Sequence, residues 1–124
     1  MINLILIYIG AALTALWGIA HLIPTKNVVK GFGELSNDNR NIITMEWIVE
    51  GVSLIFIGVL VALVAFIDPV AASSWAVFMI SIIMLLVMAI VSMFTGFKVK
   101  MLPFKLCPFI FTISALLILT GSGL

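Results

Sequence analysis

Four long apolar stretches, separated by short segments that hold charges and prolines, constrain this chain more than any other feature. Each stretch is near the roughly 20 residues that an α-helix needs to cross about 30 Å of hydrocarbon. A transmembrane β-barrel would need segments of about ten residues that alternate apolar and polar side chains, unlike the apolar run from Val77 to Met88. The sequence therefore predicts an all-α integral membrane bundle of four transmembrane helices, spanning approximately residues 2–23, 42–67, 75–97 and 106–124.

The composition makes a lipid bilayer the expected surroundings. Apolar residues make up 65% of the chain and charged residues only 9%, whereas soluble domains are roughly half apolar and about one quarter charged. The net charge of +1 argues against a nucleic-acid partner, because binding to phosphates needs a clustered basic surface. The sequence has no long polar region outside the spans that could form a soluble domain. Residues 1–124 are therefore expected to form a single membrane domain.

The positions of the basic residues predict the orientation. All six lie in the connection between the first two spans or in that between the last two: Lys26, Lys30, Arg40, Lys98, Lys100 and Lys105. Cytoplasmic connections are the ones enriched in Lys and Arg. We therefore expect a protein of the cell membrane with both charged connections in the cytoplasm and with the N- and C-termini outside.

The connection of residues 24–41 has two interpretations. Val28, Val29, Phe32 and Leu35 follow a helical spacing, which favours a short helix lying in the membrane interface. Two nearby glycines interrupt the pattern, and the alternative is a loop whose apolar side chains pack on the bundle. The polar residues 36–39 then offer several N-caps for the second span.

Only two charged side chains lie inside a span, namely Glu46 and Glu50. They are four residues apart and therefore share one face of a helix. Glu50 is eight residues past Ile42, which places it roughly 12 Å along the span at about 1.5 Å per residue. An ionisable group at that depth is costly, so it should face the bundle interior and have a partner or a proton.

The single histidine supplies the expected partner. The first span runs toward the same membrane face and carries His21 near its end, so His21 should lie level with Glu46 or Glu50. Trp17 and Trp47 belong to the same half, as do Ser53, Ser92, Thr95 and Cys107. Together they predict a pocket on the cytoplasmic side whose ligand-binding or proton-carrying residues are Trp17, His21, Glu46, Trp47 and Glu50.

Each of these residues also has a purely structural interpretation. Glu46 can be a hydrated acid that interacts with the helix dipole near the N-terminus of its helix. Trp47 can belong to the aromatic belt at the membrane surface, and His21 can bond locally or reach the headgroups. Glu50 can serve only to fix helix packing through a bond to His21 or a serine.

The small number of metal-binding side chains excludes several chemistries for a single chain. Di-iron bundles need two Glu-x-x-His motifs and bis-histidine haem needs two histidines, whereas this chain has one. We expect no metal, and a single ion on His21, Glu46 and Glu50 is a weak alternative. Aromatic walls with an imidazole and an acid instead suit a quinone-like ligand or a bound lipid. A buried glutamate is equally typical of proton-coupled exporters.

Small residues in the first span indicate close helix packing. Residues four apart in the first span, including Ala11 with Ala15 and Thr14 with Gly18, allow close approach of a neighbouring helix. Packing within the chain is the favoured interpretation, and a contact between copies in a homo-oligomer is the alternative.

A lone Cys107 cannot form an internal disulfide, which excludes a self-contained thiol oxidoreductase.

Three glycine-containing segments resemble the DoxX-like family of small four-helix membrane proteins. Residues 10–24 contain Gly10 and Gly18-Ile-Ala-His21-Leu-Ile-Pro24. The second span contains Glu50-Gly51-Val-Ser-Leu54-Ile-Phe-Ile-Gly58, and the last contains Leu116-Leu-Ile-Leu-Thr-Gly121-Ser-Gly123. The similar layout covers nearly the whole chain. The resemblance implies a membrane subunit that can associate with quinone or with partner enzymes, and it carries over only Glu50 as a functional acid.

The sequence therefore favours a redox-associated subunit, without catalytic activity of its own, that binds a quinone-like or other amphipathic ligand. Membrane or cytoplasmic proteins are its expected partners. One alternative is a small proton-coupled transporter that uses an intramembrane glutamate. The other is a structural or assembly protein with no ligand.

The predicted orientation can be tested by cysteine labelling. In a Cys107→Ser background, Lys26→Cys and Ala72→Cys should react with a membrane-impermeant maleimide from opposite sides of the membrane, because all cations lie on one side. Labelling of both positions from the same side in intact cells would contradict the charge argument.

Overall fold

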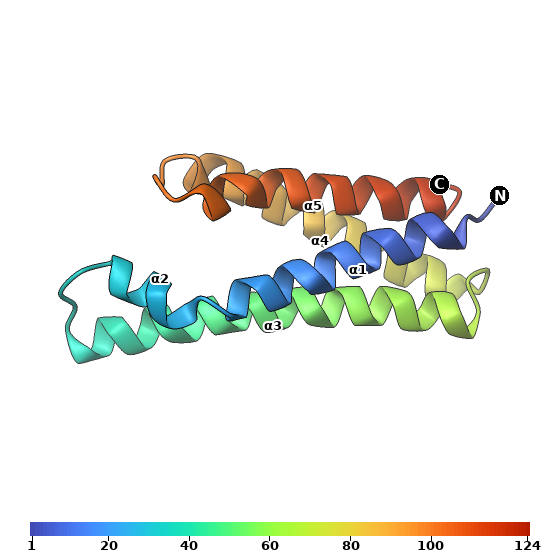
Figure 1. Ribbon diagram of the computed structural model, residues 1–124. Coiled ribbons are helices and arrows are strands. Elements are labelled where there is room, and N and C mark those ends of the chain that lie inside the picture. Colours follow the sequence, from blue (N-terminus) through green and yellow to red (C-terminus); the bar gives the residue numbers. More distant parts are fainter.

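The computed structural model describes residues 1–124, and its elements are all helices (Figure 1). Four of the five helices are long and apolar enough to cross a membrane, which confirms the predicted all-α fold with four candidate spans. In chain order the helices are α1 (Leu4–Leu22), α2 (Thr25–Gly31), α3 (Asn37–Ile67), α4 (Ala72–Gly96) and α5 (Leu102–Gly121).

Three of the long helices begin earlier than the apolar stretches suggested, and among them α4 begins at Ala72 rather than at residue 75. Helix α3 begins at Asn37 rather than at residue 42, because the Ser36 hydroxyl accepts a hydrogen bond from the Asn39 N–H at 3.2 Å and caps it. Helix α5 begins at Leu102 rather than at residue 106. Pro103 lies in its first turn, where the missing N–H needs no partner. The predicted start of the last span, at residue 106, was therefore four residues too late.

The connection before α3 contains a short helix, as one of its two interpretations predicted. Helix α2 is seven residues long and buries Val28. It ends at Gly31, so the helical pattern does not extend to Leu35. Gly33 has a φ of +79°, a left-handed conformation in which a side chain would be strained. This glycine turns the chain back toward the start of α3.

The bundle has two chemically different ends. Both termini and the α3–α4 connection lie at one end, where the Asn3 N–H donates to the Gly121 carbonyl at 2.7 Å. Helix α2 and the α4–α5 connection lie together at the other end, on the left of Figure 1. All six basic residues belong to these segments or to the adjoining first turns of α3 and α5, so we call this the cationic end.

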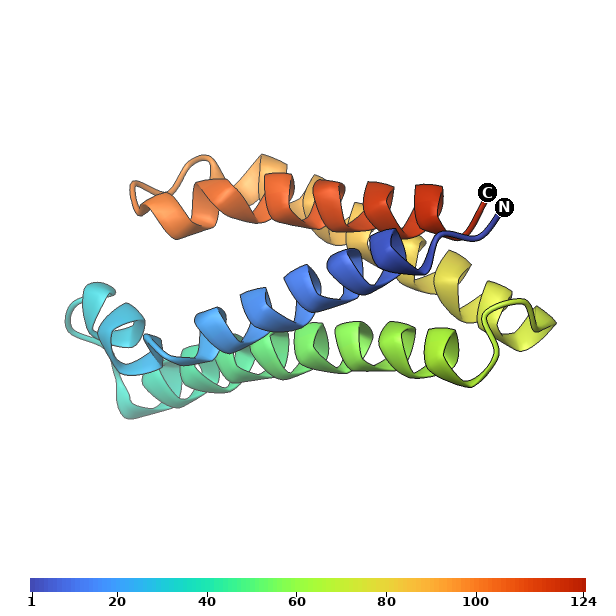
Figure 2. The same ribbon diagram turned by 45° about the vertical axis from the view of Figure 1, so that its right-hand side comes forward.

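The four long helices form two pairs, α1 with α3 and α4 with α5. Helix α1 also packs on α5, whereas α3 and α4 share only a limited contact. The two pairs lie close together at the end that holds the termini and diverge toward the cationic end, as both views show (Figure 2). The divergence positions the candidate site described below.

Small residues hold α1 and α3 at very short range. A Cβ atom on Gly18 would lie 2.6 Å from the Gly51 carbonyl oxygen, and one on Gly58 would lie 2.5 Å from that of Ala11. Such distances leave no room for a side chain, so the two backbones touch along this line. The small residues of the first span thus serve packing within the chain, as the favoured interpretation predicted.

The core is a single apolar cluster, and most of the remaining apolar surface faces outward. Only 28 of 124 residues are buried, although 65% of the chain is apolar. Large apolar side chains such as Phe66, Ile80 and Phe94 are therefore exposed, as expected for contact with lipid. The core comprises Ile7, Ala11, Leu54, Ile57, Val61, Ala65, Phe78, Ile82, Leu85, Ala89, Cys107, Phe111, Ala115 and Ile118.

The contact between α1 and α3 predicts a clear stability difference between two glycines. Gly58→Ala should lower the free energy of unfolding in detergent by about 1–3 kcal/mol, because the added methyl group meets the α1 backbone. Gly31→Ala should have little effect, because no atom lies within 4 Å of its added Cβ. Equal losses in the two variants, measured by denaturant titration, would contradict the close contact.

Candidate functional site

Three adjoining hollows lie at the cationic end, where the two helix pairs diverge. Their volumes are about 420, 280 and 180 Å³. Phe104 of α5 lines all three, and His21, Trp47, Glu50 and Cys107 each line two. Because they share these walls, we treat the three hollows as one site and call it the cleft. The predicted pocket residues Trp17 and Glu46 line one hollow each.

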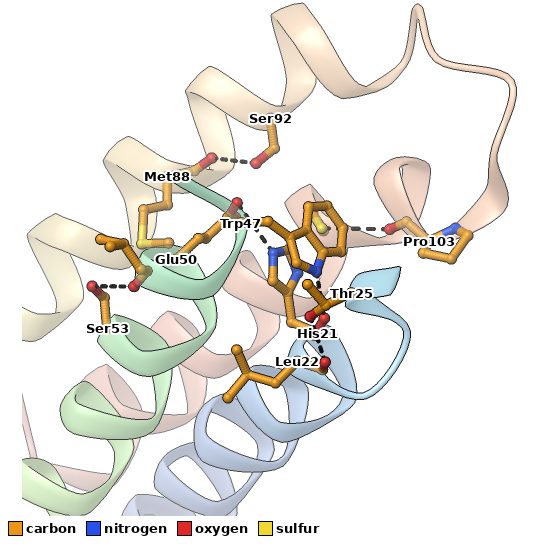
Figure 3. Close-up of polar contacts among 11 residues, drawn as sticks. His21, Leu22, Thr25, Trp47, Glu50, Ser53, Met88, Ser92 and Pro103 are labelled. Atoms are coloured by element: carbon orange, nitrogen blue, oxygen red, sulfur yellow. Dashed lines mark hydrogen bonds and ion pairs between the residues drawn. The ribbon is translucent and has the colours of Figure 1, made fainter. Parts of the chain in front are cut away.

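Trp47 of α3 and His21 of α1 make a double contact (Figure 3). Their rings stack with centroids 3.7 Å apart and planes inclined by 16°. The Trp47 Nε1–H also donates to the His21 carbonyl oxygen at 2.7 Å. Carbonyls in the last turn of a helix have no hydrogen-bond donor within that helix. The indole of Trp47 supplies a donor to one of them, the His21 carbonyl at the end of α1. Trp47 therefore has a specific tertiary contact, beyond the surface belt considered as its alternative.

His21 and Glu50 form the polar centre of the cleft. The His21 Nε2 atom lies 3.4 Å from a Glu50 carboxylate oxygen, and the two groups face each other in Figure 3. The contact is not a hydrogen bond, so Nε2 is buried without a hydrogen-bond partner in the protein. The His21 side chain is 5% exposed and that of Glu50 is 38% exposed. The imidazole of His21 is thus enclosed by the protein, whereas the carboxyl group of Glu50 faces open space.

A second buried nitrogen without a partner lies in the same region. The Trp17 Nε1–H makes no hydrogen bond, and Trp17 shares the 280 Å³ hollow with His21 and Cys107. A buried polar atom without a hydrogen bond costs about 1–3 kcal/mol, and native structures contain few of them. Two such nitrogens at one cleft give it an unused capacity for hydrogen bonding.

Glu46 is placed differently from Glu50. It lies on the same side of α3, and both glutamates line the 420 Å³ hollow, but the only ion pair in the structure is the one between His21 and Glu50. Glu46 is exposed. The interpretation of Glu46 as a helix-N-terminal acid was wrong, because α3 begins at Asn37 and the acid in its first turn is Asp38. The dipole effect fades beyond that turn.

The hydroxyl groups expected in this half of the protein also reach the cleft. Ser53 lines the 420 Å³ hollow, and Ser92 and Thr95 line the 180 Å³ hollow. Each hydroxyl donates to the carbonyl four residues earlier in its own helix at 2.7 Å. Their donors are therefore occupied, and toward the cleft they offer only acceptor oxygens.

Phe104 is the central residue of the cleft that the sequence did not reveal, since it alone lines all three hollows. Its ring packs at a tilt against Trp47, with centroids 5.4 Å apart. The only sequence signal is its place directly after Pro103, in the first turn of α5. In a span that is apolar on all sides, the sequence does not show which side chains face the interior. The position of Phe104 in the cleft can therefore be seen only in the fold.

The side chains in the cleft suit some ligands better than others. No group of three or more His, Cys, Asp or Glu side chains could hold a metal ion, so the weak alternative of a metal on His21, Glu46 and Glu50 gains no geometric support. The aromatic rings of Trp17, Trp47 and Phe104 instead line the cleft together with an imidazole and a carboxyl group. This combination matches a flat ring with a polar edge.

Comparison with known proteins adds no assignment. No family model, no curated protein and no solved structure matches the chain. The resemblance to the DoxX-like family therefore stays a prediction that depends on the glycine motifs and Glu50.

The bond between Trp47 and His21 predicts a difference between two tryptophans. Trp47→Phe keeps an aromatic ring on His21 but removes the donor to its carbonyl, and should lower the free energy of unfolding by about 1 kcal/mol. Trp75→Phe is the control, because Trp75 is 50% exposed near the other end of the bundle. Denaturant titration in detergent compares the two. A loss in Trp75→Phe as large as in Trp47→Phe would show that the bond does not stabilise the fold.

Proposed function

We propose that this chain is an integral protein of the cell membrane that binds the headgroup of a quinone-like or similarly amphipathic ligand in the cleft. The observation that carries the proposal is the His21–Glu50 pair, 3.4 Å apart beneath the stacked Trp47. In this role the protein is a redox-associated subunit without catalytic activity of its own. The ligand carries the redox chemistry, and the side chains orient it and exchange protons with it.

The size and walls of the cleft support a ring-shaped headgroup. Its largest hollow, about 420 Å³, falls within the range of about 300–1,000 Å³ that is usual for small-molecule sites. Trp47 and Phe104 offer aromatic faces for stacking. The His21 Nε2 and Trp17 Nε1 atoms lack partners in the protein, and a carbonyl or hydroxyl on the ring would satisfy a donor there.

Access from the lipid supports an amphipathic ligand over a water-soluble one. Side chains at the edge of the largest hollow face outward, with Val49 54% and Met84 45% exposed. These apolar groups would be surrounded by acyl chains in a bilayer. A ligand with an apolar tail can therefore reach Glu50 sideways from the membrane while its tail stays in lipid.

The charge distribution and the family resemblance add the cellular setting. With all basic residues at one end of the bundle, the positive-inside rule favours a cytoplasmic position for the cleft. The resemblance to the DoxX-like family supports association with quinone and with partner proteins, and Glu50 belongs to the motif that carries it. A homo-oligomer is compatible with the apolar outer surface.

Proton-coupled transport is the second candidate, and the same pair of titratable groups favours it. A transporter also needs a path to the opposite side of the membrane. Beyond the cleft, toward the termini, the bundle is filled by core side chains such as Val61, Phe78 and Phe111, each at most 1% exposed. Binding therefore fits this arrangement better than transport.

A binding assay with variants tests the proposal. Decylubiquinone added to the full chain in mild detergent should quench tryptophan fluorescence with saturation, since Trp17 and Trp47 line the cleft. Glu50→Gln and His21→Asn should each weaken binding about tenfold, the usual loss for a hydrogen bond to a charged group. Glu34→Gln is the matched control, because Glu34 is exposed and lies outside the cleft.

The outcomes separate the three functions. Native mass spectrometry of the wild-type protein should also find a bound quinone or lipid, and its absence together with unsaturable quenching would reject the binding role. Proton flux in liposomes that Glu50→Gln abolishes would establish transport instead. Loss of stability in Glu50→Gln, with neither binding nor flux in the wild type, would leave a structural role.

A further inference from the structure

A separate basic pocket lies at the cationic end, between α2 and the first turns of α3. Its volume is about 490 Å³, and it shares no residue with the cleft. Three of the six basic side chains of the protein, Lys26, Lys30 and Arg40, line it. Lys26 and Lys30 are four residues apart in α2 and therefore lie on one face of that helix, while Arg40 belongs to the first turn of α3.

The positive charges of this pocket are not balanced within the protein. The only ion pair in the structure joins His21 and Glu50, so none of the three cations is paired with a carboxylate. The nearest acids in the chain, Glu34 and Asp38, are exposed and do not line the pocket. Three like charges around one hollow repel each other, and an anion bound among them would offset this repulsion.

The donors in the pocket fit a phosphate group in particular. The planar guanidinium of Arg40 can bind two phosphate oxygens at once, and lysine ammonium groups bind the remaining charge. Asn41 adds an amide donor at the same wall. The hydroxyls of Thr25 and Thr44 already donate to the carbonyls of Leu22 and Arg40. The anion is therefore held by the basic side chains and the amide, not by these hydroxyls.

The apolar surroundings indicate a phosphate that belongs to a lipid. Large apolar side chains border the pocket residues along the chain and are exposed: Phe32 by 52%, Ile42 by 52% and Met45 by 53%. Acyl chains would cover such side chains, whereas a free phosphate ion would leave them in water. The pocket also lies at the cationic end, which the spans place at a membrane surface, where anionic headgroups gather.

We infer that this pocket binds the phosphate of an anionic phospholipid headgroup and thereby anchors α2 and the start of α3 to one leaflet. Lys26, Lys30 and Arg40 hold the phosphate, and the exposed apolar side chains beside the pocket contact the acyl chains. The site is independent of the ligand proposed for the cleft.

The test is a lipid titration of the full chain in neutral detergent, followed by native mass spectrometry. Phosphatidylglycerol should bind more tightly than phosphatidylcholine with the same acyl chains. Lys30→Gln and Arg40→Gln should each weaken phosphatidylglycerol binding about fivefold, the effect expected for one cation at a membrane surface. Lys98→Gln removes the same charge at the same end of the bundle but outside the pocket, and should leave binding unchanged.

The following results would overturn the proposed lipid site. An equal loss in Lys98→Gln, or no loss in the pocket variants, would overturn it by showing that only net charge matters. Inorganic phosphate that protects the wild type but not Arg40→Gln against thermal unfolding, without any preference for phosphatidylglycerol, would overturn the lipid as its source. Arg40→Gln should bind decylubiquinone like the wild type, so failure of the lipid site is distinguishable from failure of the cleft.

Discussion

The direct contact between the backbones of α1 and α3 underlies the rest of this structure. Gly18 and Gly51 bring the two helices so close that a methyl group would overlap a carbonyl oxygen. One turn beyond them, the same short separation allows the Trp47 indole to stack on His21 and to bond its carbonyl. With larger side chains in place of the glycines, the helices would be pushed apart and His21 would lose contact with Glu50. The polar pair therefore depends on residues that have no polar chemistry.

The second pair of helices determines how open the site is. Helices α4 and α5 join the first pair through the apolar core nearer the termini and diverge from it at the other end. The same bundle thus combines a tightly filled half with a half that holds hollows. Phe104, placed in the first turn of α5 after Pro103, extends across the open half and contacts Trp47. Rigid packing and accessible space are separated along the helix axis.

Much of this arrangement could be predicted from the sequence, because the constraints of lipid are strict. Runs of about 20 apolar residues require helices. The rise per residue placed His21 level with Glu46 or Glu50, and the 3.4 Å distance shows that Glu50 is the partner. The start of α3 could not be predicted by hydropathy, since Asn37 to Asn41 are polar and only the Ser36 cap marks them. The role of Phe104 was hidden for another reason. A helix that is apolar on all sides has no periodicity to distinguish its inner face from its lipid face.

The length of α3 has a consequence for the depth of the polar pair. Its 31 residues extend about 46 Å at about 1.5 Å per residue, well beyond the roughly 30 Å of hydrocarbon. With Ile67 at one boundary, the other boundary falls near Trp47, and the earlier turns lie in the interfacial layer, where headgroups meet the outer parts of the acyl chains. Glu50 then lies about one turn inside the hydrocarbon. At that depth the ligand of the proposed function would arrive from the acyl chains and protons would arrive from interfacial water, so both would meet at a single carboxyl group.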